Sequence, residues 1–435
     1  MSIYDEFRRF HDVHPNIVIV TETMRKGISF SNAALEQFDQ LEDVNWRGYH
    51  FFSYDKQKTI TYSAKVPFWL VLEDGCPLQI MTDMNSPYML DFVDGDFVLT
   101  ENHEPFAKGI YFDPKPKWYG MKLEDGTPME AIVQGMHGHL FFIIFNSYCE
   151  LWNKHDECLF CNINATLREQ KEGGEDVVAR KSPEVVAEVL QTARRVDPDY
   201  NAVFISGGTI LGKYRGQTEL EFYCSRLESI RNRLRVWIPS HVQIAAYDDA
   251  GWKRIHDTGV GSIGPNIEVW DKHLFEWICP GKNKFIGYDE WIRRTIRAVD
   301  FWGPGLVNPN FVIGVEMAKP YGFEDISSAV KSTASGWDFL MSHGVLPRYR
   351  LWYQEKGSAF EGQEPPPLEY FIEVQKAHAE LRWKYGFPTA LSFLCGHLSS
   401  LDSLFEYYHG TSEFSKKKLD ARGYKGPTAR DKAIA

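Results

Sequence analysis

The chain has 435 residues and a formal net charge of -11, with 48 basic and 59 acidic side chains. Hydrophobic residues make up 43% of the chain and aromatic residues 14%, which is enough to fill two domains or one barrel-sized domain with an extension. This composition excludes general disorder, and the negative charge argues against a protein that binds nucleic acid through its phosphate backbone.

The N-terminus and the apolar runs bear on where the protein works. The first residues, MSIYDEFRRFHDV, are charged and contain no apolar signal core, and no apolar run is long enough to span a bilayer. We therefore expect a cytoplasmic protein with no membrane partner. The seven cysteines are an odd number, which argues against a disulfide framework in that compartment.

Residues 1–137 have the pattern of a mostly β accessory domain. A short helix at 3–11 and a strand at 17–22 precede apolar or alternating runs at 49–52, 59–62, 66–72 and 89–93. Turn signals such as Asp74-Gly75 separate some of these runs. The domain would recognise substrate or shield a reactive centre; the alternative is a packing extension that closes one end of a barrel.

Residues 138–386 alternate between predicted strands and helices, which favours parallel β/α units. The strands are expected at 139–145, 202–206, 242–246, 262–269, 311–317 and 347–353. Helices are expected from 182 onward and at 218–234, 249–257, 288–302, 324–343 and 367–385. Six such units predict an α/β fold, a partial (β/α)6 TIM-like barrel with its active site at the carboxyl ends of the strands. Residues 387–435 would form a C-terminal extension with a basic tail.

Three cysteines follow the first predicted strand, with the spacing Cys149-x8-Cys158-x2-Cys161. Two cysteines separated by two residues can turn their thiolates toward one metal centre, and a third from the same loop can join them. Three thiolates leave one iron of a 4Fe-4S cluster open to a small molecule. A structural zinc site completed by a histidine, of which His155 is the nearest, is the alternative.

Small and polar residues follow or lie within the later strands. Glycines after the second strand let the backbone approach a ligand closely, and buried carboxylates or arginines in a barrel need partners. Arginines two residues apart on one strand face could hold a carboxylate. For the acid in the fourth strand, the alternative is a structural pairing with a lysine or arginine. For the two arginines, the alternative is surface salt bridges. The residues concerned are Gly207, Gly208, Glu268, Arg348 and Arg350.

The cysteine loop resembles that of the radical S-adenosylmethionine (SAM) superfamily. Those enzymes usually show Cys-x3-Cys-x2-Cys with an aromatic residue just before the third cysteine, and Phe160 stands in that place here. This chain lengthens the first spacing by five residues. The resemblance covers residues 138 to about 386. It implies that Cys149, Cys158 and Cys161 hold one 4Fe-4S cluster. It also implies that SAM is contacted by Phe160 and by residues of the later strands, namely Ser206, Gly207, Gly208, Thr209, Asn266, Glu268, Gly314, Glu316, Arg348 and Arg350.

The resemblance also implies an activity, reductive cleavage of SAM to start radical chemistry on a small-molecule substrate. A low-potential electron donor such as flavodoxin or ferredoxin would be the partner. Two alternatives stay open: cleavage of a different SAM bond, giving an aminocarboxypropyl radical and methylthioadenosine, and a non-catalytic zinc or iron-sulfur protein. Cys224, Cys279 and Cys395 stand singly, too sparse for the second cluster of peptide-maturing relatives, so a small substrate is favoured.

Overall fold

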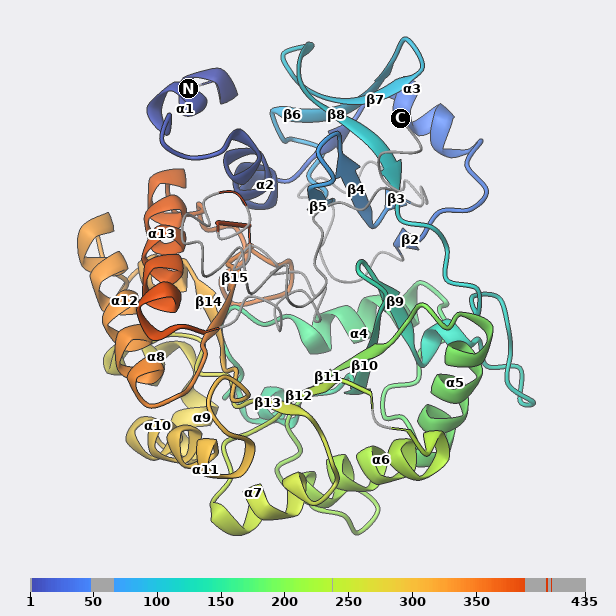
Figure 1. Ribbon diagram of the computed structural model, residues 1–435, viewed down its shortest axis with the longest axis vertical. Helices are drawn as coiled ribbons and strands as arrows, with labels where there is room; N and C mark the ends of the chain where they lie inside the picture. Colours follow the sequence, from blue (N-terminus) through green and yellow to red (C-terminus); the bar gives the residue numbers. More distant parts are fainter. Residues whose placement is uncertain (1, 48–65, 237, 388–403, 406–407, 409–435) are drawn as a thin grey trace.

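The computed structural model describes residues 2–47, 66–236 and 238–387, together with Leu404, Phe405 and Tyr408. The predicted strands at 49–52 and 59–62 lie outside the described residues, as does nearly all of the predicted C-terminal extension. Figure 1 shows two parts, a barrel in the lower half of the view and a smaller sheet with helices above it.

Parallel strands in chain order form the barrel. The first four are β10 (Leu140–Asn146), β11 (Ala202–Gly207), β12 (Ser240–Gln243) and β13 (Ser262–Gly264). Parallel bridges from Ile263 to Val307 and from Glu268 to Phe311 continue the order to the paired strands β14 (Asn310–Ile313) and β15 (Arg348–Leu351). These six strands confirm the predicted partial (β/α)6 barrel. At the other edge, β9 (Gln134–Met136) pairs antiparallel with β10.

Helices surround the barrel strands and follow the predicted alternation (Figure 1). Helix α5 begins where the sequence predicts, because Ser182 accepts a hydrogen bond from the Val185 N–H and a proline occupies the first turn. The helix predicted at 288–302 is divided into two pieces, α10 and α11. The helices are α4 (Ile163–Glu172), α5 (Pro183–Val196), α6 (Glu219–Leu234), α7 (Asp249–His256), α8 (Lys272–Ile278), α9 (Pro280–Phe285), α10 (Tyr288–Arg297), α11 (Val299–Trp302), α12 (Ile326–Ser342) and α13 (Leu368–Tyr385).

The N-terminal part is a six-stranded sheet with three helices. The strand order is β1-β6-β7-β8-β4-β5, and all neighbours except β1 and β6 run antiparallel. The strands are β1 (Ser29–Phe30), β4 (Trp69–Leu72), β5 (Pro77–Gln79), β6 (Tyr88–Val93), β7 (Asp96–Glu101) and β8 (Glu104–Phe112), and a short pair, β2 (Trp46–Arg47) and β3 (Val66–Pro67), stands beside them. The helices are α1 (Ile3–Arg9), α2 (Pro15–Lys26) and α3 (Asn32–Phe38).

The strand predicted at 17–22 is wrong, because these residues belong to helix α2. His14 caps the helix by accepting a hydrogen bond from the Asn16 N–H at 3.2 Å, and Pro15 has the backbone angle that a first helical turn requires. Every residue from Ile17 to Met24 is buried, because α2 lies between strand β5 and helix α13. A helix enclosed on all sides loses its polar stripe, so its run of β-branched residues imitates a strand.

The buried apolar core is continuous from the N-terminal sheet into the barrel. Hydrogen bonds also cross between the two parts. Gln375 of α13 donates to the Thr21 hydroxyl at 3.0 Å, and Arg25 donates to the Pro366 carbonyl at 3.3 Å. The N-terminal sheet is thereby fixed above the mouth of the barrel (Figure 1). None of the helices in the described ranges has the length and apolar character that crossing a membrane requires.

Candidate active site

The cysteine loop leaves the carboxyl end of β10 and crosses the barrel mouth. Cys149 precedes a short 3-10 helix, η2 (Glu150–Lys154), and the Cys161 N–H donates to the Cys158 carbonyl at 2.9 Å, which closes a tight turn. Asn164 of α4 holds the first cysteine by its backbone. Its Oδ1 accepts from the Cys149 N–H at 2.7 Å, and its Nδ2 donates to the Cys149 carbonyl at 3.0 Å.

The glycine turn after β11 packs directly on this loop. The Gly208 N–H donates to the Asn146 carbonyl at 2.7 Å, and Asn146 Nδ2 returns a bond to the Gly208 carbonyl at 2.8 Å. A Cβ added at Gly208 would stand 2.7 Å from Cys149 Cα, a distance that real Cβ atoms do not reach. The Thr209 carbonyl accepts from the Glu150 N–H at 2.9 Å. The structure therefore brings the predicted cysteine loop and glycine turn together.

The three thiols lie close enough to influence one another's ionisation. Burial raises the pKa of Cys149 to about 11, and burial together with the neighbouring Cys158 also raises the pKa of Cys161. Such thiols become ligands when a positively charged centre compensates for the lost protons. Among the described residues, no three histidine, cysteine or acidic side chains are gathered as a site for a metal ion. His155, which would complete the zinc alternative, ends η2 with an exposed side chain.

The chemistry of this donor set fits an iron-sulfur cluster. Thiolates are the ligands that such clusters use, and three of them come from one loop beside a backbone turn that lacks side chains. Two positions in that turn, Gly207 and Gly208, would each bring a Cβ within 2.7 Å of a neighbouring atom. The turn can therefore present its backbone, and only its backbone, to a bound group.

A fourth thiol, Cys279, lies against the cysteine loop. The junction of α8 and α9 is held on the loop because the Leu159 N–H donates to the Ile278 carbonyl at 2.9 Å and the Gly281 N–H to the Asp156 carbonyl at 2.9 Å. Cys279 hydrogen-bonds to Cys158, and this bond, followed by the charge of Lys282, lowers the pKa of Cys158 against the effect of burial. In the sequence, Cys279 stands far from the three cysteines of the loop, so its spacing did not predict this contact.

Glu268 pairs with a lysine, which is the structural alternative that the sequence left open. Lys282 Nζ lies 2.6 Å from Glu268 Oε1 and 2.8 Å from the Asn266 carbonyl oxygen. Burial acts to lower the pKa of Lys282, but the charge of Glu268 and the two neighbouring thiols outweigh burial, so its pKa is raised. Glu268 adopts a φ of 71°, which is uncommon for a residue other than glycine.

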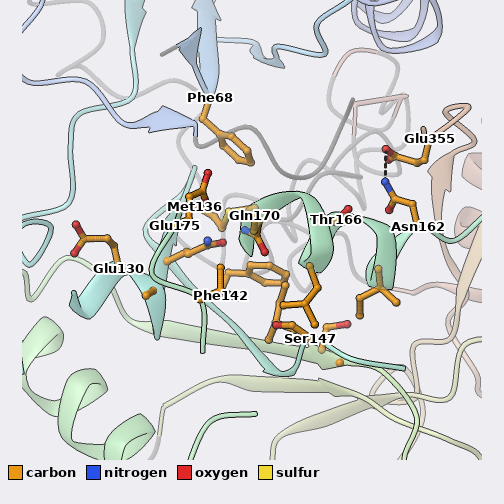
Figure 2. Close-up of a pocket in the computed structure, with 18 of the residues that line it drawn as sticks. Phe68, Glu130, Met136, Phe142, Ser147, Asn162, Thr166, Gln170, Glu175 and Glu355 are labelled. Atoms are coloured by element: carbon orange, nitrogen blue, oxygen red, sulfur yellow. Dashed lines mark hydrogen bonds between the residues drawn. The ribbon is translucent and has the colours of Figure 1, made fainter. Parts of the chain in front are cut away.

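A cavity of about 590 Å³ lies between the barrel mouth and the N-terminal sheet (Figure 2). Five predicted site residues line it, namely Phe160, Cys161, Ser206, Gly207 and Arg350. Aromatic side chains from both parts of the molecule also face it, namely Trp46, Phe68, Tyr119, Phe142, Trp352 and Tyr353. In Figure 2, Phe68 reaches down from the N-terminal sheet toward Phe142 on the opposite wall.

No family model matches the chain. A curated relative, bacteriochlorophyllide c C-7(1)-hydroxylase of Chlorobaculum limnaeum, is 22% identical over 326 residues, which is 72% of this chain and 77% of the relative. Two solved structures match parts of the chain. HydG, a maturase of the FeFe hydrogenase, matches with a TM-score of 0.41 and 12% identity over 70% of this chain and 77% of that chain. Coproporphyrinogen III oxidase (HemN) from Escherichia coli, a radical SAM enzyme, matches with a TM-score of 0.34 and 8% identity over 57% and 52%. The chain is similar to radical SAM enzymes.

Not every residue that the radical SAM resemblance singles out lies at the cavity. Gly314, Glu316 and Arg348 are outside its lining. The Glu316 carboxylate accepts hydrogen bonds from the Gly314 N–H at 2.6 Å, from the Thr333 hydroxyl at 2.6 Å and from the Tyr370 hydroxyl. Burial raises the pKa of Glu316. This acid joins the end of β14 to α12 and α13.

Polar groups of the cavity lining are held by neighbouring side chains. Ser206 Oγ donates to Gln243 Oε1 at 2.9 Å, and Asn162 Nδ2 donates to Glu355 Oε2 at 3.2 Å (Figure 2). Arg350 Nη2 lies 4.0 Å from Glu355 Oε1. The arginine at this side of the cavity is therefore partly neutralised by an acid of the same loop region.

Sequence reasoning missed two kinds of lining residue. Trp46 and Phe68 come from the N-terminal part, and only the docking of that part on the barrel brings them to the cavity. Lys181 lies in a charged connector, where lysine normally indicates a solvated loop, yet its side chain is buried at the cavity. No signal in the sequence distinguishes this lysine from its exposed neighbours.

Proposed function

We propose that the protein is a radical SAM enzyme that cleaves SAM reductively and starts radical chemistry on a small-molecule substrate bound in the cavity. One observation carries the proposal. Phe160 and Cys161 of the cysteine loop line the same cavity as Ser206 and Gly207 of the glycine turn. That residues far apart in the sequence line one cavity supports the proposal.

Cys149, Cys158 and Cys161 would hold a 4Fe-4S cluster. With SAM, such a cluster supplies the electron that breaks a carbon-sulfur bond of the sulfonium. Phe160 would lie against the adenine, and the glycine turn would offer its backbone groups to the amino acid end of SAM. Asn266, Glu268, Gly314, Glu316 and Arg348 stay predicted contacts; their places in the structure support them less than those of the cavity residues.

The cavity walls would orient the substrate and exclude water. The N-terminal sheet covers the barrel mouth and contributes Phe68 to the cavity, so the role that we propose for this part is substrate binding and shielding. Besides Phe160, six aromatic rings line the cavity, and they suit a substrate with a large apolar ring system. The curated relative, whose name gives bacteriochlorophyllide c as its substrate, supports the same class.

The experiment begins with anaerobic purification and cluster reconstitution. After addition of dithionite and SAM, mass spectrometry identifies the nucleoside that forms. We expect 5′-deoxyadenosine, which disappears in the Cys158→Ala variant. Cys224→Ala is the matched control, because that buried cysteine of α6 contacts the Arg254 carbonyl and lies outside the cavity lining.

Other products distinguish the alternatives. Methylthioadenosine in place of 5′-deoxyadenosine would establish that a different bond of SAM is cleaved. A protein that binds zinc but no iron, and that forms neither nucleoside, would contradict the proposed function. Turnover with reduced flavodoxin or ferredoxin in place of dithionite tests the expected electron donor.

A further inference from the structure

Lys181 is a buried lysine in the wall of the cavity. It stands just before α5, and its backbone is fixed on both sides. Its N–H donates to the Phe145 carbonyl at 3.1 Å, and its carbonyl accepts from Arg226 Nε at 2.6 Å. The residue is only 5% exposed, and its side chain lines the cavity. A long cationic side chain is therefore held in an apolar place by a rigid backbone.

The ammonium of Lys181 has little to compensate its charge. Its Nζ donates to the Val178 carbonyl at 3.2 Å, and no carboxylate among the described residues forms an ion pair with it. Burial alone lowers the pKa of Lys181 to about 8, so most of the lysine is still protonated at neutral pH. Removing an ammonium from water without a counterion is unfavourable, and such a position is retained when an anion completes it.

The acids of the cavity lining are engaged elsewhere or face solvent. The Glu130 carboxylate accepts from the Gly120 N–H at 3.2 Å, and Glu355 lies with Asn162 and Arg350. Glu175 forms a hydrogen bond with Gln170, and Asp176 is exposed. Electrostatic effects of these acids do not contribute to the lowered pKa of Lys181. Of the two cations in the cavity lining, Arg350 therefore lies 4.0 Å from an acid, whereas Lys181 forms no ion pair with a carboxylate of the described residues.

We propose, building on the proposed function, that Lys181 binds a carboxylate of the substrate, which would be an acid with a large apolar ring system. One ammonium matches one negative charge, and the aromatic rings of the lining supply the surface for the apolar part. The carboxylate would fix the orientation of the ring system relative to Cys161 and Phe160. The carboxylate of SAM has the same chemistry, so the experiment must distinguish the two sources.

Binding is measured with a probe pair, 1-pyrenebutyric acid and its methyl ester, on the reconstituted full-length protein. The change is Lys181→Met, which keeps the length of the side chain and removes the charge. We expect the dissociation constant of the acid to rise about tenfold or more, because a charge-assisted hydrogen bond is lost, while that of the ester is unchanged. Lys181→Arg should retain most of the preference. Lys171→Met, at the exposed end of α4, is the control.

Two further readouts separate the possible roles of Lys181. If the lysine serves binding and not folding, Lys181→Met should raise the melting temperature, because a buried unpaired charge is removed. Unchanged affinity for the acid, or a lower melting temperature, would overturn the proposal. A rise in the KM for SAM would instead assign the lysine to SAM and overturn its assignment to the substrate.

Failure of the proposed function would give a different experimental result from failure of the proposal for Lys181. A wild-type protein that forms no nucleoside from SAM would contradict the radical SAM activity, whereas the affinities for the acid and the ester in the same preparation would still report on Lys181.

Discussion

Gly208 fits between β11 and the cysteine loop because it has no side chain. A methyl group there would clash with the backbone of Cys149. This backbone cannot easily move away, because hydrogen bonds to the Asn164 side chain hold it in place. We expect Gly208→Ala to displace the loop, to lower the iron content after reconstitution, and to destabilise the fold by about 1–3 kcal/mol. Iron and sulfide analysis and thermal unfolding measure these effects.

The control for this variant is Gly212→Ala in the same loop region, where an added Cβ meets nothing within 4 Å. It should keep full iron and an unchanged melting temperature. A Gly208→Ala protein with full iron content would show that the close approach of the turn to Cys149 does not matter for the cluster.

Cys279, which hydrogen-bonds to Cys158, would influence the proposed cluster without being one of its predicted ligands. An S–H donor to a ligand sulfur stabilises the more electron-rich, reduced cluster and raises its reduction potential. Removing a hydrogen bond worth about 1 kcal/mol from a one-electron couple corresponds to about 40 mV. We therefore expect Cys279→Ala to bind iron normally and to lower the potential, measured by redox titration with paramagnetic resonance. Cys224→Ala, the control, should leave the potential unchanged. If Cys279→Ala failed to bind iron, the Cys279 thiol would itself be a ligand of the cluster, which would contradict the prediction.

The burial of Lys181 also predicts how stability depends on pH. The pKa of this lysine in the folded protein is about 8, below its ordinary value of 10.5. As the pH rises, the lysine therefore loses its proton in the folded state before it does so in the unfolded state. The cost of the buried charge to the free energy of unfolding is full below pH 8 and vanishes above pH 10.5. The difference between the two values corresponds to about 3 kcal/mol.

Lys181→Met provides the measurement. Its advantage in free energy of unfolding over the wild type should be greatest at neutral pH and should shrink as the pH rises through this window, because other groups titrate alike in both proteins. Denaturant unfolding at several pH values checks this. An advantage that grows with pH would contradict the expected sign.

At the scale of elements, Glu316 connects β14 to two helices. Its carboxylate accepts hydrogen bonds from Thr333 of α12 and Tyr370 of α13, and all three side chains are buried. Replacement by alanine leaves these donors without an acceptor, so we expect Glu316→Ala to cost about 3 kcal/mol of stability. A raised KM for SAM with unchanged stability would instead support the predicted contact with SAM.

The alternation of strands and helices after residue 138 could be predicted because it depends on local signals. Ser182 and Asp248 cap α5 and α7 as their sequences indicate. Helix α2 could not be predicted in the same way, since its β-branched residues are buried on every side by contacts that the local sequence does not contain. The predicted fourth strand is longer than β13, because the chain leaves the regular sheet after Gly264.

The candidate site also contains some residues that could be predicted from the sequence and some that could not. The cysteine loop and the glycine turn each occupy one short segment at a strand end, and parallel strands bring their carboxyl ends to the same edge, so their meeting could be predicted. Cys279 and Lys181 reach the site through the docking of the α8–α9 junction and of the connector before α5. These contacts depend on tertiary packing, and neither residue belongs to a motif.

At the scale of the whole molecule, the two parts share one core. The buried apolar cluster includes residues of α2, β4 and β5 together with residues of β10, α5 and α13. The cavity needs both parts, since Phe68 lines it from one side and Phe142 from the other. Substrate binding should therefore depend on the docking of the N-terminal sheet as well as on the barrel.

A shared core predicts that the protein unfolds in one cooperative transition. Leu78 of β5 and Leu190 of α5 are both fully buried, one in each part of the molecule. Leu78→Ala and Leu190→Ala should each cost about 2–5 kcal/mol and should lower the same calorimetric transition, with equal calorimetric and van't Hoff enthalpies. Two independent domains would give two transitions, and each variant would move only one of them. In that case the N-terminal sheet would be a separate module placed over the barrel, and cavity closure would depend on how the two modules dock. A single transition lowered by both variants would mean that the wall containing Phe68 is as permanent as the barrel, so that substrate enters a preformed cavity.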